Sequence, residues 1–204
     1  MTTTPQDLLL VALDAESGRP PEQGELSLAL AGAELIDLLG AGAVRLDGDV
    51  IVPDLRPTIA DDLLDRAAAE LVRQPPYESV EDWLWRRGRG LAAAYRATLE
   101  PEGRTGRPHR RRRPSGAAGP VPEESPDRRA ATDRLAAREP VLTGLAAAAG
   151  IGPARSEDEP DVTDDTVATV LATVHDAVRE LDAVRRRRAV EDAAFDNIWR
   201  GGGL

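Results

Sequence analysis

The fold of this chain is decided by residues 26–39, LSLALAGAELIDLL. Apolar residues recur there at spacings of three and four, the period of one face of an α-helix. The predicted apolar stripe contains Leu28, Leu35, Ile36 and Leu39. Gly40 follows at a point where glycine commonly ends a helix. The sequence therefore predicts an amphipathic helix that ends near residue 40.

The neighbouring segments give this helix an unusual context. An apolar run, Leu8–Leu13, precedes it, and residues 44–52 follow with alternating apolar side chains around an Asp-Gly turn dipeptide, which predicts a two-stranded hairpin. A further helix is expected to begin at Asp61, because carboxylates in the first turn favour the helix dipole. Asp61, Asp62 and Asp65 are better explained as this cap cluster than as a metal site. The predicted order is helix, helix, hairpin, helix.

The second half of the chain is less regular. A helix containing Trp83 ends near residues 100–103, where proline and glycine stop helical continuation. Residues 104–128 are rich in Arg, Pro, Gly and Ser without apolar periodicity, which predicts a flexible loop. A helix over 127–145, interrupted near Pro140, is expected next. Residues 163–166 cap a last long helix, whose predicted buried stripe is Val167, Val170, Leu171, Val174, Val178, Leu181 and Val184.

Length and composition favour one domain spanning residues 1–204. The chain is 41% apolar but only 3% aromatic, so its core is expected to consist of Ala, Leu and Val. The predicted fold class is mostly α: a single globular helical domain with a short β-hairpin and an Arg/Pro-rich flexible insertion at 104–128.

Several functional classes are disfavoured by the composition. The chain has no Cys, which excludes disulfides, thiolate metal sites and cysteine nucleophiles. His109 and His175 lack a neighbouring nucleophile or metal partner, so we expect no enzyme activity, no cofactor and no metal. The N-terminus lacks the basic residues of a secretory signal. The apolar runs are shorter than the roughly 20 residues that cross a bilayer. A cytoplasmic protein with at most peripheral membrane contact is expected.

The net charge of −10 is unevenly distributed. Residues 1–70 hold fourteen acidic and four basic residues, whereas residues 86–113 hold ten Arg and two Glu, a local charge of +8. Such a block attracts polyanions within roughly 8 Å at physiological salt. Lipid headgroups, nucleic acid and acidic protein surfaces are candidate partners.

The segment 83–90, WLWRRGRG, is the candidate binding constellation. On a helix, Arg86 and Arg89 would project to one side, and a guanidinium can bind a phosphate through two hydrogen bonds. The neighbouring Trp side chains suit the interface of a bilayer. The alternative is that Trp83 is a core residue and that the arginines form a solvated helix face.

Four sequence motifs resemble the Golgi phosphoprotein 3 family. The first is the apolar run that ends at Gly18, and the second is the helix Leu30–Leu38 followed by Gly42–Leu46. The third is Pro57–Asp65, which is one residue longer than the family pattern and lacks its glycine. The fourth is the helix around Trp83. The resemblance is good over residues 5–103, thin over 104–160 and present again in the last helix.

The resemblance implies a function as well as a fold. Eukaryotic members bind phosphatidylinositol 4-phosphate and act as adaptors that retain glycosyltransferases at Golgi membranes. The family's Arg-x-x-Arg pair falls here on Arg89 and Ala92, its first-helix Arg on Ala31 and its Trp on Glu22. The expected headgroup ligands are therefore Arg89, with Arg86 and Arg87 from the preceding turn. The family also implies a protein client and self-association through the hairpin. An Arg- and Ala-rich chain without Lys suggests a bacterial source with a GC-rich genome, where a Golgi role does not apply literally.

Three functions follow from these observations. A peripheral lipid-binding adaptor is favoured by the resemblance and the basic block. A soluble protein–protein adaptor that has lost lipid binding is the alternative. Nucleic-acid binding through Arg110–Arg113 is the least favoured, because the rest of the chain is acidic and no aromatic residues interleave these arginines.

Overall fold

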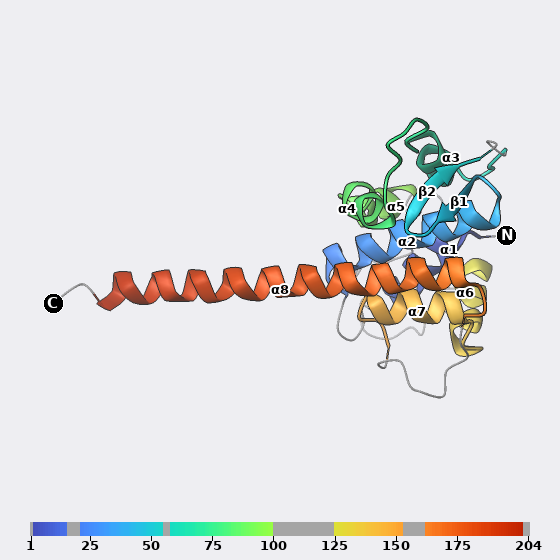
Figure 1. Ribbon diagram of the computed structural model, residues 1–204. Coiled ribbons are helices and arrows are strands. Elements are labelled where there is room, and N and C mark those ends of the chain that lie inside the picture. The colour runs from blue at the N-terminus through green and yellow to red at the C-terminus, as the bar shows by residue number, and fades with distance from the viewer. Residues whose placement is uncertain (1, 16–20, 55–57, 100–124, 153–161, 202–204) are drawn as a thin grey trace, which may run out of the picture.

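A computed structural model describes residues 2–15, 21–54, 58–99, 125–152 and 162–201. These residues form helices and one antiparallel hairpin, so the predicted fold class is confirmed (Figure 1). The elements are α1 (Thr4–Ala15), α2 (Gln23–Gly40), β1 (Val44–Asp47), β2 (Val50–Pro53), α3 (Asp62–Ala69), α4 (Val80–Arg87), α5 (Leu91–Leu99), α6 (Pro126–Ala136), α7 (Pro140–Ala148) and α8 (Asp165–Gly201).

Helix α2 is the central element of the core. It contacts α1, α4, α5, α7 and α8, and every residue from Leu26 to Ile36 is buried. The sequence predicted a helix with one buried face, but the surrounding helices cover this one on all sides. Ser27 and Glu34 are buried with the apolar residues, so the interior must supply hydrogen-bond donors to the carboxylate of Glu34.

The hairpin aligns the start of α4 with the core. Strands β1 and β2 pair in the register Val44 with Pro53 and Asp47 with Val50. The chain before α4 runs along the other edge of β2: the amide of Ile51 donates to the carbonyl of Glu78, and the amide of Val80 donates to that of Asp49. Ser79 then caps α4, because its hydroxyl accepts from the amide of Asp82.

Two predicted helix starts are confirmed, and one loop boundary is corrected. The carboxylate of Asp61 accepts from the amide of Leu64 and caps α3. The carboxylate of Asp164 accepts from the amides of Thr166 and Val167 at the start of α8. Helix α6 begins at Pro126 behind a Ser125 cap, so residues 126–128 are helical rather than part of the predicted loop. Residues 104–124 of that loop lie outside the described residues.

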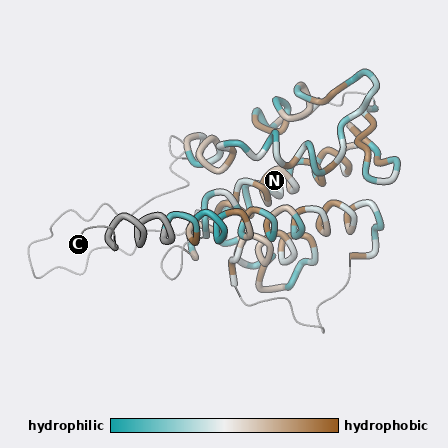
Figure 2. Tube along the Cα trace, turned by 60° about the vertical axis from the view of Figure 1, so that its left-hand side comes forward, coloured by the Kyte–Doolittle hydropathy of each residue, from teal (hydrophilic) through white to brown (hydrophobic). Residues whose placement is uncertain are grey.

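Helix α8 is 37 residues long, and its two halves have different surroundings. The first half packs on α2, α4 and α7 through Val170, Leu171, Val174 and Val178. Val184 is 41% exposed, so the buried stripe ends before it. The C-terminal part of α8 extends away from the other elements (Figure 1). In the hydropathy-coloured view the apolar positions of α8 lie mainly over the body (Figure 2). None of the helices formed by the described residues is long and apolar enough to cross a membrane.

Candidate functional site

Trp83 belongs to the core. Its side chain is completely buried, and its indole nitrogen donates to the carbonyl of Ala31 over 3.1 Å. This contact joins α4 to the middle of α2. The core alternative is therefore the one that the structure supports for Trp83, and the indole has no access to a bilayer.

Arg87 lies in an interior ion network. Its Nε and Nη2 donate to the two carboxylate oxygens of Glu34 over 2.8 and 2.9 Å, and the hydroxyl of Tyr95 donates to the same carboxylate over 3.0 Å. Burial raises the pKa of Glu34, and Arg87 and Tyr95 reduce this shift without cancelling it. Burial and the negative charge of Glu34 also raise the pKa of Tyr95. Burial alone would lower the pKa of Arg87, but its bonds to Glu34 outweigh this effect and raise it.

Arg86 is held on the surface by carboxylates. Its Nε and Nη2 donate to Glu78 over 2.6 and 2.7 Å, and its Nη1 lies 3.6 Å from Glu70. The hydrogen bond to Glu78 is the main cause that raises the pKa of Arg86. The guanidinium carbon lies 5.2 Å from the centroid of the Trp83 ring. These contacts occupy the two sides of the guanidinium that a phosphate would use.

Arg89 has a different environment because α4 ends before it. Gly88 is the C-cap of α4, and a Cβ at this position would lie 2.6 Å from the carbonyl oxygen of Leu84. Gly90 follows with a positive φ of 72°. Arg86 and Arg89 therefore do not share a helix face, contrary to the expectation from their spacing. Arg89 is exposed and makes no ion pair with any residue that the structure describes.

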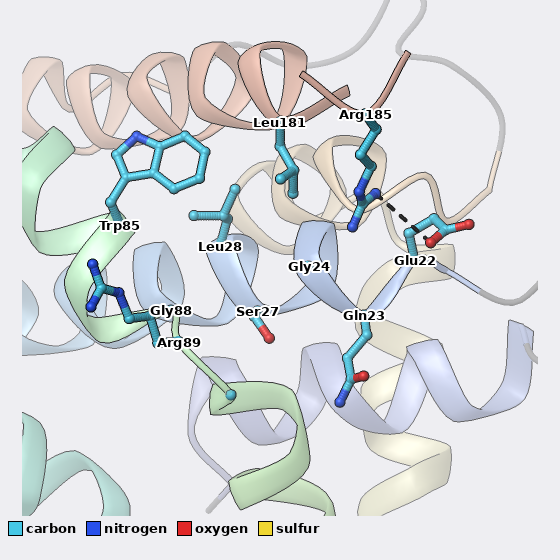
Figure 3. A pocket seen from close by; sticks show the side chains of 11 residues that line it. Glu22, Gln23, Gly24, Ser27, Leu28, Trp85, Gly88, Arg89, Leu181 and Arg185 are labelled. Carbon is cyan, nitrogen blue, oxygen red and sulfur yellow. Dashed lines mark ion pairs between the residues drawn. The ribbon is translucent and has the colours of Figure 1, made fainter. Parts of the chain in front are cut away.

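A groove of about 560 Å³ lies beside Arg89 (Figure 3). It is formed by the N-terminal part of α2, the α4–α5 connection and the middle of α8. Its lining residues are Glu22, Gln23, Gly24, Ser27, Leu28, Trp85, Gly88, Arg89, Gly90, Leu181 and Arg185. The indole of Trp85 is half-buried, so the groove combines an aromatic wall with a guanidinium.

Arg185 supplies a second guanidinium to this groove from α8. Its Nη1 donates to Glu25 over 3.0 Å and lies 3.8 Å from Glu22, so its charge is partly balanced. Burial and the neighbouring Asp182 raise the pKa of Glu25. In Figure 3, Arg89 and Trp85 lie toward one end of the groove and Arg185 and Glu22 toward the other. The end of the groove at Arg89 is thus the more strongly positive.

Comparison with protein families matches residues 5–193 to Golgi phosphoprotein 3 (GPP34). The chain belongs to the Golgi phosphoprotein 3 family. Comparison with curated proteins and with solved structures gives no match. The family match covers α1 to α7 and most of α8, including both sides of the groove.

The four positions carried over from the Golgi phosphoprotein 3 family divide into two groups. Glu22 and Arg89 both line the groove, so the family resemblance and the geometry point to the same place. Ala31 and Ala92 are completely buried: the carbonyl of Ala31 accepts from Trp83, and the amide of Ala92 donates to Ser27. A headgroup in the groove therefore cannot contact their side chains.

The sequence predictions did not include Trp85 and Arg185 as part of one site. Arg185 opens a run of four arginines at the end of a predicted buried stripe, and its i, i+4 spacing from Leu181 indicated that the two side chains lie on the same face of that helix. His175 lies on α8, whereas His109 and Arg110–Arg113 lie outside the described residues. The proposed nucleic-acid contact through those arginines is therefore not tested.

Proposed function

We propose that this chain is a non-enzymatic peripheral adaptor that binds the phosphate of an anionic phospholipid headgroup, of the phosphatidylinositol 4-phosphate type, in the groove beside Arg89. One observation carries the proposal: Arg89 is an exposed guanidinium beside a groove of about 560 Å³, and no carboxylate among the described residues pairs with it. Family membership supports the same ligand class.

The groove offers two kinds of contact to such a ligand. Arg89 can donate two parallel hydrogen bonds to phosphate oxygens, and its charge makes each of them stronger than a neutral bond. The indole of Trp85 and the side chains of Leu28 and Leu181 give the groove an apolar wall. Arg86 and Arg87 act indirectly. Arg87 pairs with Glu34 of α2 and with Glu70 at the end of α3, and Arg86 pairs with Glu78 in the segment before α4.

The second candidate is a soluble protein–protein adaptor that keeps the family fold without lipid binding. Glu22 favours it, since its exposed carboxylate at the rim of the groove repels a phosphate. The ion pair between Arg185 and Glu25 also favours the soluble adaptor, because it reduces the positive charge that Arg185 offers to a phosphate. Under this alternative the groove would accept a protein segment.

Co-sedimentation with vesicles containing phosphatidylinositol 4-phosphate at low salt separates the two candidates. We expect the wild-type chain to bind and Arg89→Ala to weaken binding about tenfold, the effect of losing roughly 1.5 kcal/mol from a charged hydrogen bond. Glu22→Gln should strengthen binding, because it removes a repulsive charge. Arg86→Ala is the matched control, since Arg86 faces Glu78 rather than the groove.

Two results would overturn the lipid proposal. A wild-type chain that stays in the supernatant with every anionic vesicle would favour the soluble adaptor. Equal binding by Arg89→Ala and the wild type would show that any lipid contact lies outside the groove.

A further inference from the structure

The end of the groove that lies away from Arg89 holds an opposite-charge pair, Arg185 of α8 and Glu22 before α2 (Figure 3). Nη1 of Arg185 donates to Glu25 over 3.0 Å but lies 3.8 Å from Glu22, which is too long for a hydrogen bond. The side chain of Glu22 is 67% exposed and that of Glu25 is 14% exposed. Glu22 is therefore the carboxylate of this pair of glutamates that a ligand can reach.

Arg185 keeps one side of its guanidinium for a ligand. It approaches Glu25, Glu22 and Asp182 through Nη1. Nη2 instead lies over Gly24, where a Cβ would be only 2.6 Å from it. Because residue 24 lines the groove and has no side chain, Nη2 stays open to the groove. This end of the groove thus offers a positively charged donor and a negatively charged acceptor close to each other.

The two ends of the groove are close together. Ser27 marks the end at Arg89, because a Cβ at Gly88 would lie 3.4 Å from the carbonyl oxygen of Ser27. Glu22 marks the other end, and the five residues from Glu22 to Ser27 correspond to a helical rise of about 7.5 Å. A ligand that uses both ends therefore needs only a short chain between its charged groups.

We propose that the groove selects a phosphoserine headgroup, in which a short chain joins the phosphate to an ammonium and a carboxylate. Arg89 binds the phosphate. The carboxylate of the ligand accepts from Nη2 of Arg185, and its ammonium donates to Glu22, so that each contact is a charge-assisted hydrogen bond. Leu28 and Leu181 lie between the two charged ends and contact the methylene carbon (Figure 3).

This inference rests on the proposed function, because it keeps the phosphate at Arg89 and concerns only the groups that follow the phosphate. It also gives Glu22 a role. The carboxylate that repels a headgroup made only of anionic groups attracts a headgroup that carries an ammonium as well. Glu22 is thus the specificity-determining residue of the groove, and phosphatidylserine, which has a net negative charge, is the lipid that carries this headgroup.

Calorimetric titration of the full chain at low salt with three matched ligands tests the assignment. O-phospho-L-serine carries the phosphate, the ammonium and the carboxylate. O-phosphoethanolamine lacks only the carboxylate, and 3-phosphooxypropanoate lacks only the ammonium. The wild type should bind O-phospho-L-serine about threefold more tightly than either of the others, the effect of one partly exposed ion pair.

Glu22→Gln should change the affinities for two of these ligands in opposite directions. It should weaken the binding of O-phospho-L-serine about threefold, because the ammonium loses its counter-charge. It should strengthen the binding of 3-phosphooxypropanoate, because a repulsive charge is removed. Arg185→Gln should remove the preference for O-phospho-L-serine over O-phosphoethanolamine. Glu81→Gln is the matched control: it removes an exposed carboxylate outside the groove and should leave all three affinities unchanged.

Two results would overturn this inference and leave the proposed function intact. They are equal affinities of the wild type for the three ligands, and a Glu22→Gln variant in which the affinities for O-phospho-L-serine and 3-phosphooxypropanoate change in the same direction. A wild type that binds neither these three ligands nor inositol 1,4-bisphosphate would overturn the proposed function together with the inference.

Vesicles distinguish a lipid headgroup from a soluble phosphate compound. Phosphatidylserine and phosphatidylglycerol carry the same net charge, so vesicles with equal amounts of either lipid attract basic residues equally through charge alone. Vesicles with phosphatidylserine should retain more of the wild type in co-sedimentation, and Glu22→Gln should remove this difference. Equal retention by the two kinds of vesicle, together with binding of free O-phospho-L-serine, would assign the groove to a soluble ligand and overturn the lipid headgroup.

Discussion

Arg87 and Arg89 are two residues apart and have opposite environments. The side chain of Arg87 is 10% exposed and pairs with Glu34, which is completely buried, whereas Arg89 is exposed at the rim of the groove. The end of α4 at Gly88 separates them. A run of basic residues is thus not one binding surface. The backbone divides it into a residue that holds the core together and a residue that remains accessible to an anion.

Removal of Arg87 should have the largest effect on stability. In Arg87→Leu the carboxylate of Glu34 stays buried without its counter-charge, and we expect a loss of about 3–5 kcal/mol in the free energy of unfolding. Urea denaturation measures it. The adjacent Arg86→Leu is the matched control and should cost less, about 1–2 kcal/mol, because Arg86 is 39% exposed and its partner Glu78 is less deeply buried than Glu34. Equal losses in the two variants would refute the interior role of Arg87.

Tyr95→Phe should cost less, roughly 1.5–3 kcal/mol, because it removes one hydrogen bond to the charged Glu34. The loss should depend on pH. Burial holds the pKa of Glu34 above its ordinary 4.5, and removal of the hydroxyl raises it further. Because the pKa of Glu34 is raised in the folded state, its contribution to the free energy of unfolding is complete below about pH 4.5, where the carboxyl group is protonated. This contribution declines as pH rises through the pKa of Glu34 in the folded protein. The deficit of Tyr95→Phe should therefore be larger at pH 7 than at pH 4, and a deficit independent of pH would contradict this.

Two glycines of α2 allow the interior and the groove to be compared within one helix. A Cβ at Gly32 would lie 2.4 Å from Cγ2 of the buried Val174, so Gly32→Ala should cost about 1–3 kcal/mol. A Cβ at Gly24 would lie 2.6 Å from Nη2 of Arg185 and 2.8 Å from Cδ2 of Leu181. These are ends of side chains that can move, so Gly24→Ala should destabilise less and alter ligand binding instead. Thermal unfolding of both variants measures the two losses of stability. A larger loss in Gly24→Ala than in Gly32→Ala would contradict the prediction.

Arg89→Ala should have the smallest effect on stability, within about 0.5 kcal/mol, as expected for an exposed side chain without a described ion pair. Its unfolding curve in urea should overlay that of the wild type while vesicle binding falls. A clear shift of the midpoint would mean that Arg89 supports the fold.

Much of the fold was predictable because it depends on local patterns. The apolar period of residues 26–39, the Asp-Gly turn of the hairpin and the cap at Asp61 each determine an element within a few residues. The burial of α2 on all sides was not predictable, since it depends on helices from distant parts of the chain. Glu34 lies within the predicted helix of residues 26–39, but its partner Arg87 lies 53 residues away in the sequence.

The candidate site was predictable only in part. Arg89 follows from the family resemblance and lies on the groove, whereas the grouping of Arg86 with Arg89 assumed that one helix continued through Gly88. Arg185 comes from an element almost 100 residues further along the chain. Only the packing of α8 on α2 brings it to the groove, and no local pattern encodes that contact.

Titration of the isotope-labelled chain with inositol 1,4-bisphosphate, the soluble headgroup of phosphatidylinositol 4-phosphate, tests the central claim most directly. Amide shifts in the NMR spectrum should move at the groove, at Ser27, Leu28, Arg89 and Gly90, while those of Glu34 and Tyr95 remain in place. In Arg89→Ala the same shifts should need about tenfold more ligand, without a change in the rest of the spectrum. Shifts confined to residues outside the groove, or an unchanged titration midpoint in Arg89→Ala, would contradict the account.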